Sequence, residues 1–187
     1  METAPGKLIR WHYLWYAAAA LAAMIAVIVS HRLWYLDFVH VFCGLLWTGI
    51  DLFMGFLLGP ILRAVDIGAR RAVLLRLTPR TLFLMPTLAI ITGTTGWYIA
   101  QELGFTALPW PTYGWVAAAL VLVVLMSLQG LGYLLPANLR VCLELQKAKP
   151  DNARIATLTR HYFRAIALQG LMQIVTIIIM ARVATGI

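Results

Sequence analysis

An apolar stretch, residues 34–60, carries polar side chains whose spacing could support chemistry in a membrane. At about 100° per residue, one helical face of this stretch collects its ionisable side chains together with tryptophan and glycine. The residues of this polar stripe are Asp37, His40, Gly44, Trp47, Asp51 and Gly55. Carboxylate and imidazole groups are costly in a bilayer, so they normally face protein, water or a cofactor. The pattern therefore predicts a helix that forms the inner wall of a bundle.

His40 is the strongest candidate for a metal ligand. An imidazole binds haem iron, and a glycine one turn along the same face, Gly44, leaves room for a flat macrocycle. Trp47 then supplies a second wall of the pocket, by stacking or through its indole N–H. This interpretation predicts a b-type haem with His40 as the metal ligand and with Gly44 and Trp47 binding the cofactor. The alternative is a structural histidine, hydrogen-bonded inside the bundle, for example to Asp37.

A second axial ligand is harder to find. His12 and His161 are expected near the cytoplasmic side, several turns from His40 in depth, and His31 is expected at the aqueous boundary. Met180 should lie at a depth similar to that of His40, so it is the predicted weak sixth ligand, although methionine is more often simple packing. A five-coordinate iron and a ligand from a partner subunit remain open.

Asp51 lies about 16 Å from His40 along the helix axis, at 1.5 Å per residue. A carboxyl group at mid-membrane must be protonated or paired. We predict a catalytic role for Asp51 as a proton relay between the cytoplasm and the His40 site, with a structural hydrogen bond as the alternative. Its candidate neighbours are Gln129, Gln169, Gln173, and Thr94 or Thr95.

The composition supports a membrane setting for these residues. Of 187 residues, 62% are hydrophobic and 12% are charged, which predicts one integral membrane domain over residues 1–187. The net charge of +8 comes from cations in short loops, so it indicates cytoplasmic loops and not binding to nucleic acid. Neither a CxxC nor a CxxCH motif occurs, so neither a thiolate zinc site nor a c-type haem is indicated.

Five apolar runs are long enough to cross a bilayer and predict an all-α fold. The expected spans are residues 14–30, 34–62, 81–101, 113–139 and 162–184. The cytoplasmic connections GFLLGPILR (55–63) and GYLLPANLR (132–140) resemble each other, which predicts a tandem repeat of helix hairpins. Spans two to five would then form a four-helix bundle, with span one added at the front.

Loop charge predicts the orientation of the chain. Lys7 and Arg10 precede the first span. The connection between spans two and three and the connection between spans four and five are rich in arginine and lysine. The opposite side of the membrane carries Arg32 and Arg182. The positive-inside rule therefore places the N-terminus in the cytoplasm and the C-terminus in the periplasm of a bacterial inner membrane. The arginine-rich segment 63–80 is expected to lie on the membrane surface and to bind anionic lipid.

Parts of the chain also resemble known families. The run LDFVHVFCGLLWTGIDLFMGFLLGP is similar to the histidine-bearing helix of the copper-resistance CopD superfamily, through Leu36, His40, Trp47, Gly49 and Pro60. The run RTLFLMPTLAIITGTTGWYI is similar to the Met-Pro…Gly-Trp helix of membrane-embedded HemJ-type protoporphyrinogen oxidase. The matching residues there are Met85, Pro86, Gly96 and Trp97. The resemblance implies a small helical bundle that binds b-type haem through a histidine.

These features lead to one main functional hypothesis and two others. The first is a haem-dependent membrane oxidoreductase or electron carrier that exchanges electrons with quinone or a partner subunit near the outer face. The second is a non-catalytic accessory subunit of a larger membrane complex, or a homo-oligomer, because the loops are minimal. The third is copper or ion permeation along Asp37, His40 and Asp51.

Overall fold

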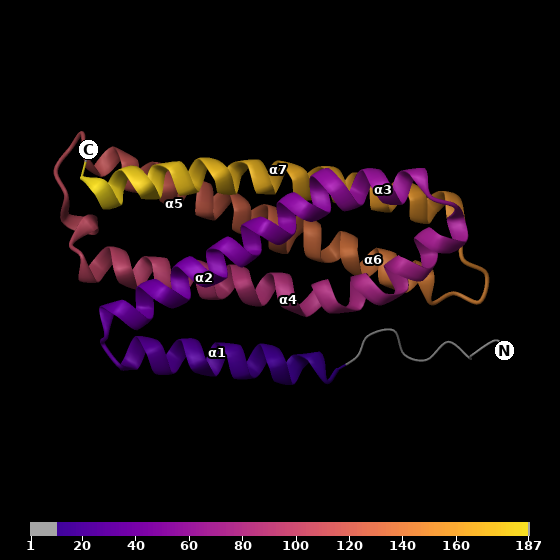
Figure 1. Ribbon diagram of the computed structural model, residues 1–187, viewed down its shortest axis with the longest axis horizontal. Helices are drawn as coiled ribbons and strands as arrows, with labels where there is room; N and C mark the ends of the chain where they lie inside the picture. Colours follow the sequence, from indigo (N-terminus) through magenta and orange to yellow (C-terminus); the bar gives the residue numbers. More distant parts are fainter. Residues whose placement is uncertain (1–10, 187) are drawn as a thin grey trace.

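The computed structural model describes residues 11–186 as a bundle of helices, and this part of the chain contains no strand (Figure 1). The first helix, α1, covers Tyr13–Val29. The second rod consists of α2 (Leu33–Leu52), the π-helical turn η1 (Phe53–Leu58) and α3 (Gly59–Ala64). Next come α4 (Ile67–Glu102) and the 3₁₀ turn η2 (Phe105–Ala107).

The second half of the chain repeats this architecture. A third rod consists of α5 (Tyr113–Gln129), the π-helical turn η3 (Gly130–Leu134) and α6 (Leu135–Leu145), and α7 covers Asn152–Thr185. Four rods, Leu33–Ala64, Ile67–Glu102, Tyr113–Leu145 and Asn152–Thr185, are long and apolar enough to cross a membrane, and α1 is a shorter apolar helix of 17 residues. The predicted all-α, five-helix membrane fold is confirmed.

The packing places four rods together and α1 beside them. The α2 rod packs against α4 and α7, α5 packs against α7, and α6 packs against both α4 and α7. Helix α1 lies along the outside, mainly against α4 (Figure 1). The predicted four-helix core with an added first helix therefore matches the observed arrangement.

Two helices begin well before their predicted starts. Helix α4 begins at Ile67 and not at 81, and α7 begins at Asn152 and not at 162. Each start has an aspartate N-cap: Asp66 accepts from the Ala69 amide at 2.9 Å and Asp151 from the Arg154 amide at 3.0 Å. The basic segment 63–80 is therefore mostly the first part of α4. With 36 residues, α4 measures about 54 Å, against about 30 Å of hydrocarbon.

Positive charge gathers at the end of the bundle where α3 meets α4 and α6 meets α7. We call this the basic end, and its cations are Arg63, Arg70, Arg71, Arg76, Arg80, Arg140, Lys147, Lys149, Arg154, Arg160 and Arg164. Arg32 and Arg182 belong to the opposite end. Lys7 and Arg10 lie outside the described residues.

The resemblance between the two predicted cytoplasmic connections has a structural counterpart. In both rods a π-helical turn precedes a short α-helix with proline in its first turn, Pro60 in α3 and Pro136 in α6. Proline has no amide hydrogen, and a wider turn accommodates its ring within a continuous rod. The similar sequences thus encode the same local geometry twice.

Close approach of α2 and α7 depends on glycine. A Cβ atom added at Gly55 would lie 2.6 Å from the Cα atom of Ala167, so the two backbones touch at this point. Gly170 has the same role from the other helix, because an added Cβ would lie 2.9 Å from Leu52 Cδ2. Small residues at such crossings are how membrane helices approach without a hydrophobic driving force.

Gly55→Ala should destabilise the protein, because the new methyl group meets backbone that cannot move aside. We expect a loss of about 1–3 kcal/mol in the free energy of unfolding, measured by thermal or SDS-induced unfolding in detergent. Gly49→Ala is the matched control on the same rod: nothing lies within 4 Å of its added Cβ. Equal stabilities of the two variants would contradict the close helix crossing.

Candidate functional site

His40 lies against α4. Its Nδ1 is 3.0 Å from the carbonyl oxygen of Thr92, and because a carbonyl only accepts, Nδ1 carries the proton and donates. The Thr95 hydroxyl lies 3.4 Å from the same nitrogen. Gly96 makes space for the ring, since an added Cβ there would lie 2.7 Å from His40 Cε1. The imidazole is thus oriented by the α4 backbone and not by Asp37.

The second ring nitrogen of His40, Nε2, has no hydrogen-bond partner among residues 11–186. Nε2 also retains some accessible surface. A metal-binding histidine commonly donates its other N–H to a backbone carbonyl, which fixes the tautomer. The imidazole therefore fits the role of an axial ligand.

The residues predicted to complete the haem pocket do not gather around this imidazole. The space beside Gly44 is taken by Thr92, whose Cγ2 lies 3.3 Å from a Cβ built on the glycine. Trp47 is buried and faces the cavity of Asp51, and Met180 is 37% exposed on α7. Between positions 11 and 186, no three His, Cys, Asp or Glu side chains come close enough to hold a metal. Within residues 11–186, Gly44 thus faces Thr92, and Trp47 faces the cavity of Asp51.

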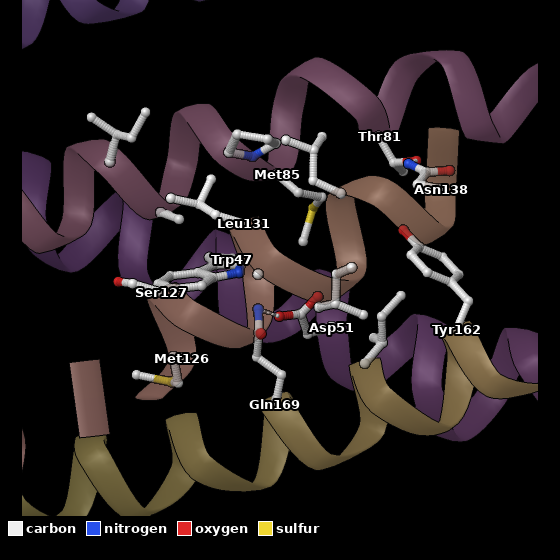
Figure 2. A pocket seen from close by; sticks show the side chains of 17 residues that line it. Trp47, Asp51, Thr81, Met85, Met126, Ser127, Leu131, Asn138, Tyr162 and Gln169 are labelled. Carbon is white, nitrogen blue, oxygen red and sulfur yellow. Dashed lines mark hydrogen bonds between the residues drawn. The ribbon is translucent and has the colours of Figure 1, made fainter. Parts of the chain in front are cut away.

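Asp51 is the centre of a buried polar cluster. It lies near the middle of its 32-residue rod and is 1% exposed. Its Oδ2 accepts from Gln173 Nε2 at 3.1 Å and from Gln169 Nε2 at 3.3 Å, both on α7. Figure 2 shows Gln169 pointing up from α7 toward the carboxyl group. Two of the predicted neighbours of Asp51 are therefore its hydrogen-bond partners.

The other predicted neighbours have different contacts. Gln129 donates to the carbonyl oxygen of Ala165 at 2.7 Å, which ties α5 to α7. Thr95 belongs to the His40 cluster. Asp37 is exposed and makes no ion pair with any described residue, while Arg182 lies over the ring of Trp115, 4.5 Å from its centroid.

The Asp51 cluster contains more acceptors than donors. The amide oxygens of Gln169 and Gln173 are both buried and have no partner in the described chain. None of the ion pairs within residues 11–186 involves Asp51. Because buried polar atoms are nearly always paired, these two amide oxygens require a donor that no described side chain supplies, such as water or a ligand.

A cavity of about 100 Å³ adjoins the carboxyl group. Side chains from all four rods line it, including Trp47, Met85, Met126 and Gln169 (Figure 2). Most of its wall is apolar. Gly130 borders it next to the unpaired Gln169 oxygen, which lies 4.0 Å from a Cβ built on that glycine. The volume is several times the space that one water molecule needs.

The cavity opens toward the lipid-facing side of the bundle. Three of its lining residues, Ile90 of α4, Ser127 of α5 and Leu131 of η3, are also exposed on the outer surface. Helix α4 packs on α2 and α6, and α5 packs on α7, so the opening lies between α4 and α5. The cavity is therefore bordered on this side by residues exposed on the apolar outer surface.

Sequence reasoning missed three polar residues at the far side of this cavity. They are Thr81, Asn138 and Tyr162, and Asn138 Nδ2 donates to the Thr81 hydroxyl at 3.1 Å. On α7, Tyr162 shares one face with Gln169 and Gln173, at steps of seven and four residues. That spacing was a usable signal for a second polar stripe.

Comparison with known proteins gives no family for this chain. No family model, no curated protein and no solved structure matches it. The resemblance to the CopD and HemJ families stays a prediction. Function is therefore inferred from the geometry of the site.

Asp51→Asn should leave stability unchanged or raise it. The asparagine amide keeps the shape of the carboxyl group, removes its charge and adds donors for the unpaired glutamine oxygens. Asp51→Leu should lower stability by about 1–3 kcal/mol for each glutamine left without its partner. Thermal unfolding of the purified variants in detergent measures both effects. If Asp51→Asn and Asp51→Leu destabilise the protein equally, the Asp51 cluster does not have an excess of acceptors.

Proposed function

We propose that this chain is a membrane redox protein that binds the head group of a lipid-soluble hydroquinone at Asp51 and accepts a proton from it. The observation that carries the proposal is the buried carboxyl group with an unpaired amide oxygen beside it, at a cavity open to the bilayer. A hydroquinone brings hydroxyl donors to a site that has an excess of acceptors.

The shape and polarity of the cavity also suit this ligand class. Ligand pockets typically combine apolar walls with a few placed polar groups. Here Met85, Pro86 and Ala89 supply an apolar wall for an aromatic ring, and Asp51 and Gln169 supply acceptors. The lateral opening at Leu131 gives a ring with an apolar tail a route from the hydrocarbon.

In this proposal, the two glutamines and Asp51 have different roles. Gln169 and Gln173 hold the Asp51 carboxylate in one orientation by donating to Oδ2. Asp51 then acts as a general base, taking the proton from a ligand hydroxyl within hydrogen-bond reach. The ligand oxygen becomes a phenolate, which gives up an electron more easily than the neutral hydroxyl. A one-electron carrier, if bound at His40 or in a partner subunit, would supply the acceptor for that electron.

The proposal also includes a location and an orientation in the membrane. We place the chain in a bacterial inner membrane, with the basic end and N-terminus in the cytoplasm and the C-terminus in the periplasm. The concentration of arginine and lysine at the basic end supports this orientation.

A b-type haem ligated by His40 is the second candidate function. The hydrogen bond from Nδ1 to Thr92 and the unpartnered Nε2 favour it specifically. Such a haem would supply one-electron transfer. Because Thr92 fills the space beside Gly44, the macrocycle would lie at a contact with a partner subunit or a second copy. No observation favours an accessory role or copper or ion permeation over these two candidates.

Hydroquinone binding is tested by equilibrium dialysis against the protein in lipid nanodiscs. A short-chain hydroquinone should bind at least about tenfold more tightly than its dimethyl ether, which lacks the hydroxyl donors. Leu131→Trp, which narrows the opening, should weaken binding, whereas Leu128→Trp should not. Leu128 lies on the same rod, is 66% exposed and does not line the cavity. Equal binding of the hydroquinone and the ether would overturn the proposal.

Haem binding is tested by the reduced-minus-oxidised absorption spectrum of purified protein. His40→Ala should abolish the haem bands. Gly96→Ala should weaken them, because its methyl group displaces the imidazole, while Gly93→Ala should not, since its nearest contact is Val123 Cγ1 at 4.0 Å. Folded wild-type protein that stays free of haem when haem is supplied would rule out this candidate.

A further inference from the structure

A second, smaller cavity lies on the basic-end side of the Asp51 cavity. Its volume is about 10 Å³, close to the space of one water molecule. The two cavities share three lining residues, Thr81, Asn138 and Tyr162. Figure 2 shows the Tyr162 hydroxyl pointing toward Thr81 and Asn138. The polar interior around Asp51 therefore continues past these three side chains.

Thr159 lies at the far side of the small cavity. It is 5% exposed, and its hydroxyl has no hydrogen-bond partner among the described residues. A buried hydroxyl without a protein partner normally bonds to water. The small cavity, with space for a single water molecule, is next to the Thr159 hydroxyl. The structure therefore places a hydroxyl that lacks a protein partner beside a space that fits water.

Helix α7 arranges these groups in one line. Four residues of α7 lie on one face: Thr159, Tyr162, Gln169 and Gln173. The 14 residue steps from Thr159 to Gln173 span about 21 Å. Thr159 is seven residues from Asn152, the first residue of α7, or about 10 Å from the basic end. The buried side chain of Ile155 lies in the turn between Asn152 and Thr159.

The other side of Asp51 has a different character. The buried cluster toward the opposite end consists of Met24, Cys43, Trp47, Leu88, Ile91 and Met126. These apolar side chains offer no hydroxyl or carboxyl group. Thr92 and Thr95, also on this side, lie beside His40 and do not line the Asp51 cavity. Of the hydroxyl-bearing residues that line the Asp51 cavity, Thr81 and Tyr162 lie on the basic-end side, and Ser127 lies at the opening.

We propose that Asp51 exchanges its proton with the basic end through a relay of water and the hydroxyl groups of Tyr162 and Thr159. Each hydroxyl accepts one proton from the water or hydroxyl before it and gives its own proton to the next, so the relay groups are unchanged after each transfer. Thr81 and Asn138 position the Tyr162 end of the relay. The inference requires an exchangeable proton on Asp51, and it does not require hydroquinone binding.

The test is infrared spectroscopy of the full-length protein in lipid, without added hydroquinone. The carboxylic acid band that Asp51→Asn removes is followed after a switch from H₂O to D₂O. Thr159→Val and Tyr162→Phe should each slow the shift of this band by about tenfold or more. Thr159→Ser, which keeps the hydroxyl, should restore fast exchange.

Thr176→Val is the matched control. Thr176 is a half-buried threonine on the same helix whose hydroxyl donates to the Met172 carbonyl at 2.9 Å, and it lies on the other side of Asp51. In Thr176→Val, the Asp51 carboxyl proton should exchange as fast as in wild type. Exchange as fast as wild type in both Thr159→Val and Tyr162→Phe would overturn the relay. The lack of any band that depends on Asp51, at every pH where the protein stays folded, would also overturn it.

Discussion

The structure depends on the need to pair one carboxyl group in the middle of a membrane bundle. Asp51 has no basic partner among the described side chains, and two glutamines of α7 donate to a single oxygen of it. Hydrocarbon offers no alternative donors, so this contact fixes which faces of α2 and α7 meet. It also leaves the glutamine oxygens unpaired, which makes the same contact a site for a molecule that brings donors.

The close crossing of α2 and α7 makes this pairing possible. Gly55 brings the two helices into backbone contact at Ala167, about one turn toward the basic end from Asp51. Gly170 meets the Leu52 side chain at the level of the Asp51 hydrogen bonds. Short glutamine side chains can then reach across the contact. On the far side, α4 and α5 have no comparable contact, and the space between them is the cavity. Tight packing on one side and an opening on the other thus come from the same arrangement of helices.

The sequence alone was enough to predict the helices and the inward face of the second rod, because apolar length and 100° periodicity are local properties. It also named Gln169 and Gln173 as candidate partners of Asp51. It did not distinguish them from Gln129, because the contacts join residues 118 and 122 positions apart and depend on how the rods pack. The early starts of α4 and α7 could not be predicted from apolar length, because the residues before 81 and 162 are basic. The aspartate caps extend both helices beyond the hydrocarbon. The neighbour of Gly44 could not be predicted for a similar reason: whether a glycine leaves a space or admits a side chain depends on the opposing helix, here Thr92.

The paired π-helical turns have a consequence for how this protein can vary. A π-helical turn holds one residue more than an α-helical turn of the same height, so it is equivalent to a single-residue insertion within a helix. Loss of one residue from Phe53–Leu58 or Gly130–Leu134 can be absorbed by a return to regular α-helix. The same deletion elsewhere in these rods rotates every later side chain by about 100°. Length variation among related chains should therefore be concentrated at these two turns.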